Sequence, residues 1–446
     1  MQFAYKKLSS CLHPILLVRN FIETETQKSK FVCMVQLDLS IAFDTVELSK
    51  ILPSKMKFYG FDQNSVEFFR SFFQNRYHFA DWNGTESQPI PLLNHSVTQG
   101  SSISSFFYNL YTQDIQNVTD CICVNFADDL CMLFSDYNIN VLIKQVNEEL
   151  AKIANYMKEN TLIINEKKSG HLIFKPKRVK DEVADESPTI NGAEISQVQN
   201  TKFLGVWFDD KLKFDKQYEM VSKKLENTVR ALICVKDSLN FKSKMLVYNS
   251  LFRSHIDYCS ISYLDRLNKS QLNELSKLQK NAVRLIFSAR RNTHTGKLFQ
   301  LAKIRPIENV YKEEATKFVL KYINDINKEH PRAIERILFK GNLDKRGIRA
   351  YDDESKIKIH HDFKKGNCIF NILDAWNQND KNIRMAGNTY SLKKLLDEKL
   401  EKEVIKCELN CDSDRKCTFF AAKDSPFHLI SDTKSTQSYL SESKDE

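Results

Sequence analysis

Two adjacent carboxylates, Asp128 and Asp129, stand between two short apolar segments of this 446-residue chain. Residues 121–125 and 131–134, on either side of the stretch 126–130, are β-prone, so the pattern predicts a tight hairpin with both acids at its tip. Neighbouring ionised carboxylates repel each other and lose hydration on an apolar hairpin, which is costly unless a cation neutralises them. The residues therefore indicate a divalent metal site. The alternative is that they are ordinary polar turn residues, since Asp is common in turns.

A third acid, Asp38, ends an upstream segment that is apolar enough to be a strand buried on both faces, residues 31–37. A buried strand that delivers one acid, together with a hairpin that delivers two, is typical of a two-metal site for phosphoryl transfer. Hard carboxylate oxygens favour Mg²⁺, which binds substrate phosphates as well. We therefore expect two Mg²⁺ ions, with Mn²⁺ as a substitute.

The order of the elements predicts how these acids meet. A strand at 31–37 is followed by helical patterns, the hairpin at 121–134, a helical pattern after Asn138, and strand material near 170–174. This β-α-β-β-α-β order is the split βαβ (ferredoxin-like) plan, in which acids at one end of neighbouring central strands converge. The fold class expected from the sequence is α+β.

Charge and cysteine content limit the partners and the compartment. The net charge is +9, and bases without an intervening acid accumulate between Lys277 and Arg305, which favours contact with a phosphate backbone. A solvated helix face is the alternative. The 11 cysteines include several inside apolar strands, and neither a signal peptide nor a long apolar run occurs. We expect an intracellular protein of the cytoplasm or nucleus, not secreted and without a membrane partner.

With these segments in place, the motif order resembles the reverse transcriptases of non-LTR (LINE-type, jockey-like) retrotransposons. LDLSIAFDTV at 37–46, TQGSSISSFFYNLYTQDI at 98–115 and FADD at 126–129 resemble the first three palm motifs. NTLIINEKKSGHLIF at 160–174 and TKFLGVWFDDKLKF at 201–214 resemble the fourth and fifth. Five motifs in one order are far more specific than any single one.

The resemblance implies an RNA-directed DNA polymerase that adds deoxynucleoside triphosphates to a DNA primer on an RNA template. Asp38 and Asp128 would hold both metals, Asp129 would complete the acid set, and Leu39 would lend a backbone carbonyl. Phe43 matches the steric gate that excludes a ribonucleotide 2′-hydroxyl. Without the resemblance, Phe43 could equally be a core residue at a strand-to-helix turn.

The resemblance assigns further residues by their positions in the motifs. Gln99 and Gly100 would support the template and incoming nucleotide, and Leu204 with Gly205 would form the primer grip. Lys168 aligns with the lysine that helps the leaving group, with Lys167 beside it as the alternative. The nucleic-acid-binding bases would include Lys280, Arg284, Arg290 and Arg291.

By the same resemblance we expect a residual fingers segment at 1–30 and a palm at 31–215. A basic helical thumb at 216–306, a C-terminal helical region at 307–430 and a disordered tail at 431–446 would follow. The second motif departs from the family pattern at Thr98, Ser104 and Ser105, and the first at Ile41. The chain starts inside the fingers pattern, so we expect an N-terminally truncated enzyme with weakened triphosphate binding.

Two other function classes stay open on the sequence alone. One is a catalytically inactive, nucleic-acid-binding relic of a retrotransposon, whose binding would depend on salt but not on Mg²⁺. The other is a nucleotidyl cyclase or another enzyme on the same split βαβ plan, which would explain the acids but not residues 99–100 or the basic helices.

Overall fold

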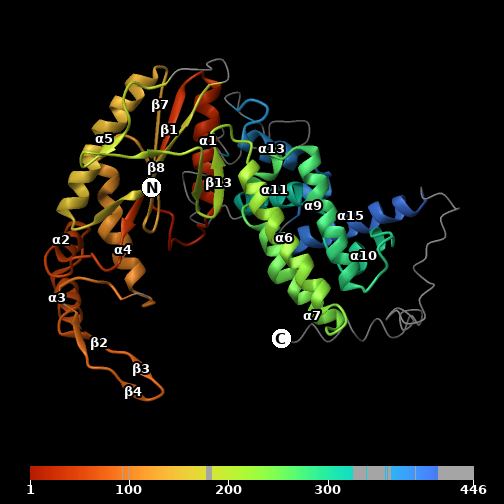
Figure 1. Ribbon diagram of the computed structural model, residues 1–446, viewed down its shortest axis with the longest axis horizontal. Coiled ribbons are helices and arrows are strands. Elements are labelled where there is room, and N and C mark those ends of the chain that lie inside the picture. Colours follow the sequence, from red (N-terminus) through yellow and green to blue (C-terminus); the bar gives the residue numbers. More distant parts are fainter. Residues whose placement is uncertain are drawn as a thin grey trace. The chain divides into compact units, whose positions relative to one another are not determined.

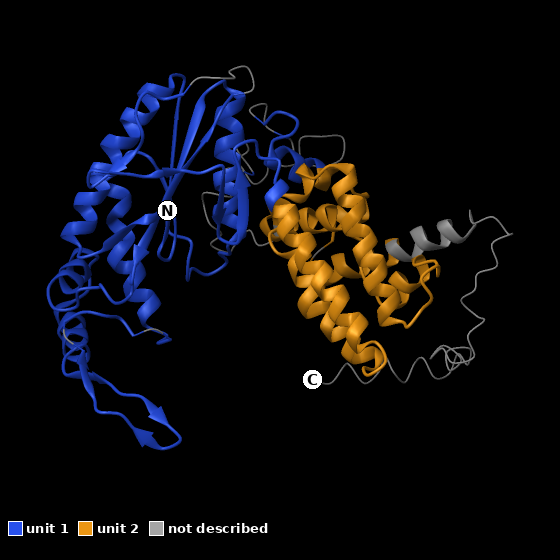
Figure 2. Ribbon diagram, in the orientation of Figure 1, with its two compact units in different colours: residues 1–216, 325–352, 358–374 blue, residues 217–324, 353–357, 375–446 orange. Residues whose placement is uncertain are grey.

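The chain divides into two units, which are coloured separately in Figure 2. Unit 1 comprises residues 1–216, 325–352 and 358–374, and unit 2 comprises residues 217–324, 353–357 and 375–446. The computed structural model describes residues 1–409 except 93, 99, 177–182, 325–337, 339–356, 358, 360–362 and 387, and for 400–409 it describes the backbone alone. The expected disordered tail at 431–446 lies outside these residues.

Unit 1 is built on a five-stranded sheet with the order β11-β8-β1-β7-β6 (Figure 1). The strands are β1 (Phe31–Ser40), β6 (Ile122–Phe126), β7 (Asp129–Asp136), β8 (Ile163–Phe174) and the short β11 (Ser196–Gln197). β1 is antiparallel to both β7 and β8, and β6 is antiparallel to β7. The order β8-β1-β7-β6 is the one expected for a split βαβ sheet, and the prediction of an α+β fold is confirmed.

Helices cover both faces of this sheet. Alternate β1 side chains, including Cys33, Val35 and Leu37, pack into a core with α2 (Ile51–Phe58), α4 (Ser104–Thr112) and α5 (Ile139–Glu159). α1 (Leu12–Gln27) packs on the other face, opposite α5 in Figure 1. Because β1 is buried from both sides, it is apolar nearly throughout.

An extended ribbon follows α3 (Gln63–Phe72) in unit 1. β2 (Arg76–His78) pairs with β5 (Ile90–Leu92), and β3 (Asp81–Trp82) pairs with β4 (Thr85–Glu86). The β3–β4 turn is Asn83-Gly84, and both residues have positive φ, 51° and 81°. The Asn-Gly pair in the sequence predicts a hairpin at this place, because Asn-Gly favours such a turn, and the structure confirms it.

The apolar run at 202–208 predicts one continuous strand with Gly205 inside it, and this prediction is wrong. The chain forms a hairpin of β12 (Asn200–Phe203) and β13 (Val206–Asp209), and Leu204-Gly205 is its two-residue turn with φ values of 46° and 83°. Gly205 therefore serves the turn rather than a close backbone approach inside a strand. A second small hairpin joins β9 (Thr189–Ile190) to β10 (Ala193–Glu194).

Unit 2 is helical in its described part. Its helices include α6 (Asp215–Val235), whose first two residues belong to unit 1, α7 (Phe241–Val247), α8 (Ser254–Asp257), α9 (Lys269–Ile286), α10 (Gly296–Leu301), α11 (Ile307–Asn324), α14 (Lys381–Arg384) and α15 (Thr389–Leu409). A π-helical segment, residues Tyr248–Arg253, joins α7 to α8. The apolar periodicity of the sequence predicts helices at 218–235, 271–287 and 309–326, and these are confirmed as α6, α9 and α11 within three residues at the described ends, since residues 325–326 lie outside the described part. The short α10 was not anticipated.

A segment far along the chain returns to unit 1. The backbone N–H of Cys368, at the start of α13 (Cys368–Asn377), donates to Glu23 of α1 at 2.6 Å, and Asn367 Nδ2 donates to Asn20 Oδ1 at 3.2 Å. The sequence analysis treated this region as a separate C-terminal part and did not anticipate the contact. No helix among the described residues is long and apolar enough to cross a membrane.

Candidate active site

The strand register brings Asp38 and Asp129 face to face. Leu37 of β1 pairs with Leu130 of β7, so one step further along the two antiparallel strands Asp38 lies opposite Asp129. Directly opposed residues of such a pair have Cβ atoms about 4.5–5.5 Å apart. Asp129 also pairs with Phe126 of β6, and the two-residue turn between them is Ala127-Asp128. The three predicted acids therefore meet at one end of the sheet.

The electrostatics of Asp129 support this convergence. Partial burial raises the pKa of its carboxyl, and the nearby carboxylates of Asp128 and Asp38 raise it further. Asp129 as a whole residue stays exposed, and the carboxylates of Asp128 and Asp38 are close enough to contribute to its raised pKa. Negative charge accumulates here without full compensation, which is the condition that favours a bound cation.

The acids do not form a closed set of ligands by themselves. Among residues with described positions, no group of three or more His, Cys, Asp and Glu side chains is close enough to enclose a metal ion. The donor chemistry nevertheless fits Mg²⁺, since carboxylate oxygens are its preferred protein ligands and it commonly takes one or two of them plus substrate phosphates. Leu39, the fourth predicted ligand, follows Asp38 in β1, where it pairs with Ile164.

A bulge in β8 places Lys168 beside the acids. Gln36 pairs with Gly170 and Asp38 with Asn165, so five steps along β8 oppose two steps along β1. The extra residues contain Lys167 and Lys168, and Lys168 Nζ lies 3.9 Å from Asp38 Oδ2. Bulges often re-aim a side chain next to an active site in this way.

Ser169 anchors this bulge, and the sequence analysis missed it. The backbone N–H of Asp38 donates to Ser169 Oγ at 3.2 Å, and Ser169 Oγ donates to the carbonyl of Asn165 at 2.8 Å. Ser169 is 2% exposed, so the link is shielded from water. A serine at a bulge has no distinctive sequence signal, because only the strand register shows which backbone it meets.

Phe43 lies in the turn after β1 and stacks on a buried tyrosine. Its ring centroid is 4.4 Å from that of Tyr108 in α4, with an angle of 17° between the ring planes. Tyr108 is fully buried, and its hydroxyl has no hydrogen-bond partner among the described residues. Burial raises the pKa of Tyr108, with smaller contributions from Asp128, Tyr5 and Asp129. The sequence analysis missed Tyr108 because an aromatic residue on a helix reads as core.

The remaining predicted residues of unit 1 fall in three places. Gly100 is exposed, with a φ of 86° that favours glycine. Gln99 lies outside the described residues. The turn of Leu204 and Gly205 belongs to the hairpin that Gln36 of β1 holds, through its contact with Thr201 Oγ1 and a 3.3 Å hydrogen bond to the Lys202 carbonyl. That hairpin is thus attached to the strand that carries Asp38.

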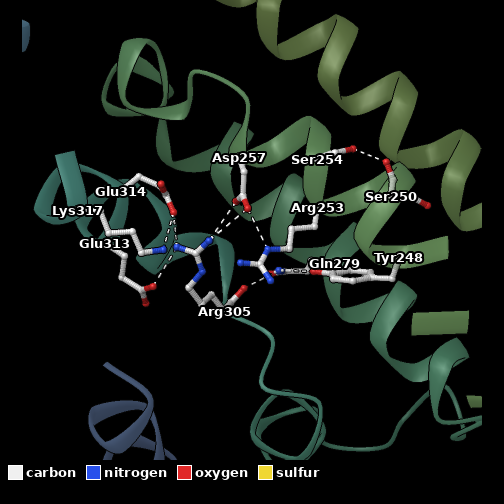
Figure 3. A network of polar contacts seen from close by, with 10 residues as sticks. All are labelled: Tyr248, Ser250, Arg253, Ser254, Asp257, Gln279, Arg305, Glu313, Glu314 and Lys317. Atoms are coloured by element: carbon white, nitrogen blue, oxygen red, sulfur yellow. Dashed lines mark hydrogen bonds and ion pairs between the residues drawn. The ribbon is translucent and has the colours of Figure 1, made fainter. Parts of the chain in front are cut away.

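The predicted nucleic-acid-binding bases belong to unit 2. Lys280 is half-buried on α9, and Arg290 and Arg291 are exposed in the connection from α9 to α10. Arg284 is less available, because Nε donates to the Thr293 carbonyl at 2.9 Å and Nη1 donates to Asn281 Oδ1 at 3.3 Å. Arg305, which closed the basic stretch in the sequence, is bound in a partly buried ion-pair network instead (Figure 3).

The segment that carries the three acids also matches a known protein family. Residues 1–208 match the family model described as reverse transcriptase (RNA-dependent DNA polymerase). This match covers the sheet with its three acids, the Phe43 turn and most of the β12–β13 hairpin. Residues 1–208, slightly less than half of the chain, are therefore similar to a reverse transcriptase domain in sequence.

The particular resemblance is to jockey-like, non-LTR retrotransposon enzymes, as the five motifs predicted. The chain is 22% identical over 348 residues to the RNA-directed DNA polymerase from mobile element jockey of Drosophila funebris, and 20% identical over 348 residues to the probable RNA-directed DNA polymerase from transposon BS of Drosophila melanogaster. Each alignment covers 76% of this chain and 37% of the relative. The chain thus spans little more than a third of the length of these curated relatives.

Similar solved structures include two fungal telomerases. The telomerase of Candida albicans in complex with a telomeric RNA fragment is 11% identical, with a TM-score of 0.32 and coverage of 68% of this chain and 55% of that chain. The apo telomerase of Candida tropicalis is 12% identical, with a TM-score of 0.33 and coverage of 75% and 55%.

Proposed function

We propose that this chain is an RNA-directed DNA polymerase of a non-LTR retrotransposon, with residues 1–30 as part of the fingers, 31–215 as palm, 216–306 as thumb and 307–430 as a C-terminal region, of which residues 410–430 and most of 325–356 lie outside the described part. Its substrates are an RNA template, a DNA primer and deoxynucleoside triphosphates. The observation that carries the proposal is the register that sets Asp38 opposite Asp129 at the hairpin of Asp128, inside a segment that matches reverse transcriptases.

In the proposed reaction the primer 3′-oxygen forms a bond to the α-phosphorus of the incoming nucleotide, and the bond from that phosphorus to the bridging oxygen of pyrophosphate breaks. Asp38, Asp128 and Asp129, with the Leu39 carbonyl, would hold two Mg²⁺ ions, which would supply charge neutralisation for the triphosphate and ease deprotonation of the primer hydroxyl. Lys168 donates a proton to the leaving pyrophosphate. Its place beside Asp38 favours it over Lys167.

Other residues select and position the substrates. The ring of Phe43 occupies the space that a ribonucleotide 2′-hydroxyl would need. Gly100, and with it Gln99, supports the template and the incoming nucleotide, while the turn of Leu204 and Gly205 contacts the primer. In unit 2, Lys280, Arg290 and Arg291 contact backbone phosphates, and Arg284 contributes less because its guanidinium is already bound.

A primer-extension assay tests the proposal. The purified chain is given a primed RNA template, deoxynucleoside triphosphates and Mg²⁺, beside the variants Asp128→Asn and Asp120→Asn. Asp120 is a matched control because its carboxylate is exposed and pairs with Lys152 at 3.3 Å. We expect extension by the wild type and by Asp120→Asn, and a loss of about 100- to 1000-fold in Asp128→Asn.

Two results would contradict the proposal. One is extension that survives in Asp128→Asn, which would place the activity elsewhere. The other is absence of extension in the wild type together with RNA or DNA binding that depends steeply on salt and not on Mg²⁺, which is the behaviour of a non-catalytic binding relic.

A further inference from the structure

The side chain of Gln2 binds the backbone of the turn that carries Asp128. Gln2 is 5% exposed. Its Oε1 accepts hydrogen bonds from the backbone N–H groups of Phe3, Ala4 and Ala127 at 3.0, 3.0 and 3.1 Å, and its Nε2 donates to the carbonyl of Ala127 at 3.4 Å. The Gln2 carboxamide thus hydrogen-bonds both the backbone N–H and the backbone carbonyl of Ala127, the residue before Asp128.

Ala127 is a residue that needs such support. It occupies the first position of the two-residue turn between β6 and β7, and its φ is 56°. The left-handed region is unfavourable for a residue with a Cβ atom, and tight hairpin turns that require it at this position favour glycine. An alanine there persists when surrounding contacts hold it, and Gln2 provides those contacts.

The segment that carries Gln2 is itself fixed at both ends. It runs beside β6, where Phe3 N–H donates to the Asn125 carbonyl at 2.9 Å and Asn125 N–H donates to the Met1 carbonyl at 2.8 Å. Asn109 of α4 donates from Nδ2 to the Ala4 carbonyl at 2.9 Å. Because the backbone around Gln2 is held in place, the hydrogen bonds of its side chain restrain the position of the turn at Ala127.

We propose that Gln2 is a positioning residue for the acid pair: its carboxamide holds Ala127 in the left-handed conformation, and this keeps Asp128 and Asp129 in the place that nucleotide transfer requires. The structural part of this inference stands on the contacts above. The catalytic part rests on the proposed polymerase function.

The test replaces Gln2 by methionine, which has a similar size but neither hydrogen-bonding group. Gln74→Met is the matched control, because Gln74 is exposed in the same unit. Amide hydrogen exchange, followed in peptides that cover residues 124–130 without metal or substrate, reports the turn directly. We expect exchange in this peptide to become about 10-fold faster in Gln2→Met, from the loss of the Ala127 hydrogen bond, and to stay unchanged in Gln74→Met.

Primer extension supplies the second measurement. We expect kcat to fall about 10- to 100-fold in Gln2→Met with little change in the KM for the nucleotide, since misplacement of reacting groups by about 1 Å has an effect of this size. Adding Ala127→Gly to Gln2→Met should recover part of the rate, because glycine adopts a positive φ without steric strain.

Exchange at residues 124–130 that stays at the wild-type rate in Gln2→Met would overturn the inference. Faster exchange across all of unit 1, with a lower melting temperature and no recovery by Ala127→Gly, would also overturn it, since it would indicate a general role in folding. If the wild type extends no primer, the proposed function fails, while the exchange measurement still decides whether Gln2 holds the turn.

Discussion

At the scale of single residues, two buried side chains hydrogen-bond the backbone of the segments that carry the acids of the candidate site. The backbone N–H of Asp38 is bound by Ser169, and the carbonyl and N–H of Ala127 are bound by Gln2. Both partners are buried and neutral. They bind the backbone of Asp38 and of the residue before Asp128 without adding positive charge that would compete with a cation for the carboxylates.

The stack of Phe43 on Tyr108 leads to a prediction on sugar selection. Tyr108→Ala removes the ring whose centroid lies 4.4 Å from that of Phe43, so the Phe43 ring loses its stacking partner. We expect the ratio of ribonucleotide to deoxynucleotide incorporation to rise about 10- to 100-fold. Phe43→Ala should raise this ratio by a similar factor. Single-nucleotide incorporation with each triphosphate measures the ratio.

Tyr108→Phe is the control for this prediction, because it keeps the ring and removes the hydroxyl that has no partner among the described residues. It should discriminate as the wild type does. Equal loss of discrimination in Tyr108→Phe and Tyr108→Ala would mean that the hydroxyl, rather than the stack, is responsible.

The bulge in β8 leads to a prediction that separates two adjacent lysines. Lys167 and Lys168 are both exposed, but Lys168 approaches Asp38. We expect Lys168→Ala to slow nucleotide addition by on the order of 100-fold, the usual contribution of a general acid, and Lys167→Ala to change it little. Pre-steady-state single-turnover rates make the comparison. A larger effect for Lys167→Ala would reverse the assignment.

At the scale of elements, an ion-pair network around Arg305 links α8 and α11 within unit 2 (Figure 3). Arg305 follows α10 and binds Glu313 and Glu314 of α11 at 3.1 and 2.6 Å, and Asp257 of α8 at 3.3 Å. Burial alone would raise the pKa of Glu314, but Arg305 and Lys317 lower it overall. In Glu313 burial prevails and the pKa is raised. A shared guanidinium thus compensates three partly buried carboxylates.

We expect Arg305→Ala to destabilise the protein by about 3–5 kcal/mol, because it leaves these carboxylates without their common partner. Arg230→Ala is the control, since Arg230 is exposed and lies 3.9 Å from Glu226; it should cost about 0.5 kcal/mol or less. Urea unfolding followed by circular dichroism measures both. Equal losses in the two variants would show that the network contributes no more than a surface pair.

At the scale of the whole molecule, the acids belong to unit 1 and the predicted phosphate-binding bases to unit 2. In the proposed polymerase, unit 2 contacts backbone phosphates, while the chemistry takes place at Asp128 in unit 1. Binding and catalysis should therefore respond to different substitutions.

The salt dependence of binding tests this separation. Arg290 and Arg291 are exposed, so we expect each alanine substitution to lower the slope of log K against log salt by about 1. Arg284→Ala should lower it less. Fluorescence anisotropy with a primed template at several KCl concentrations gives the slopes. Slopes that stay at the wild-type value in both exposed variants would remove these residues from the interface.

The sequence by itself determined the split βαβ order, the hairpin of Asp128 and Asp129, and the resemblance to reverse transcriptases, because strand periodicity, turn residues and motif order are local signals. It did not indicate Gln2, Ser169 or Tyr108, and it misjudged the Leu204-Gly205 turn and Arg305. Those features depend on strand register and on contacts between residues far apart in the chain: Gln2 meets Ala127 across 125 positions and Asp38 meets Ser169 across 131. A hydrogen bond of that kind leaves no pattern in the sequence, so only the tertiary structure decided it.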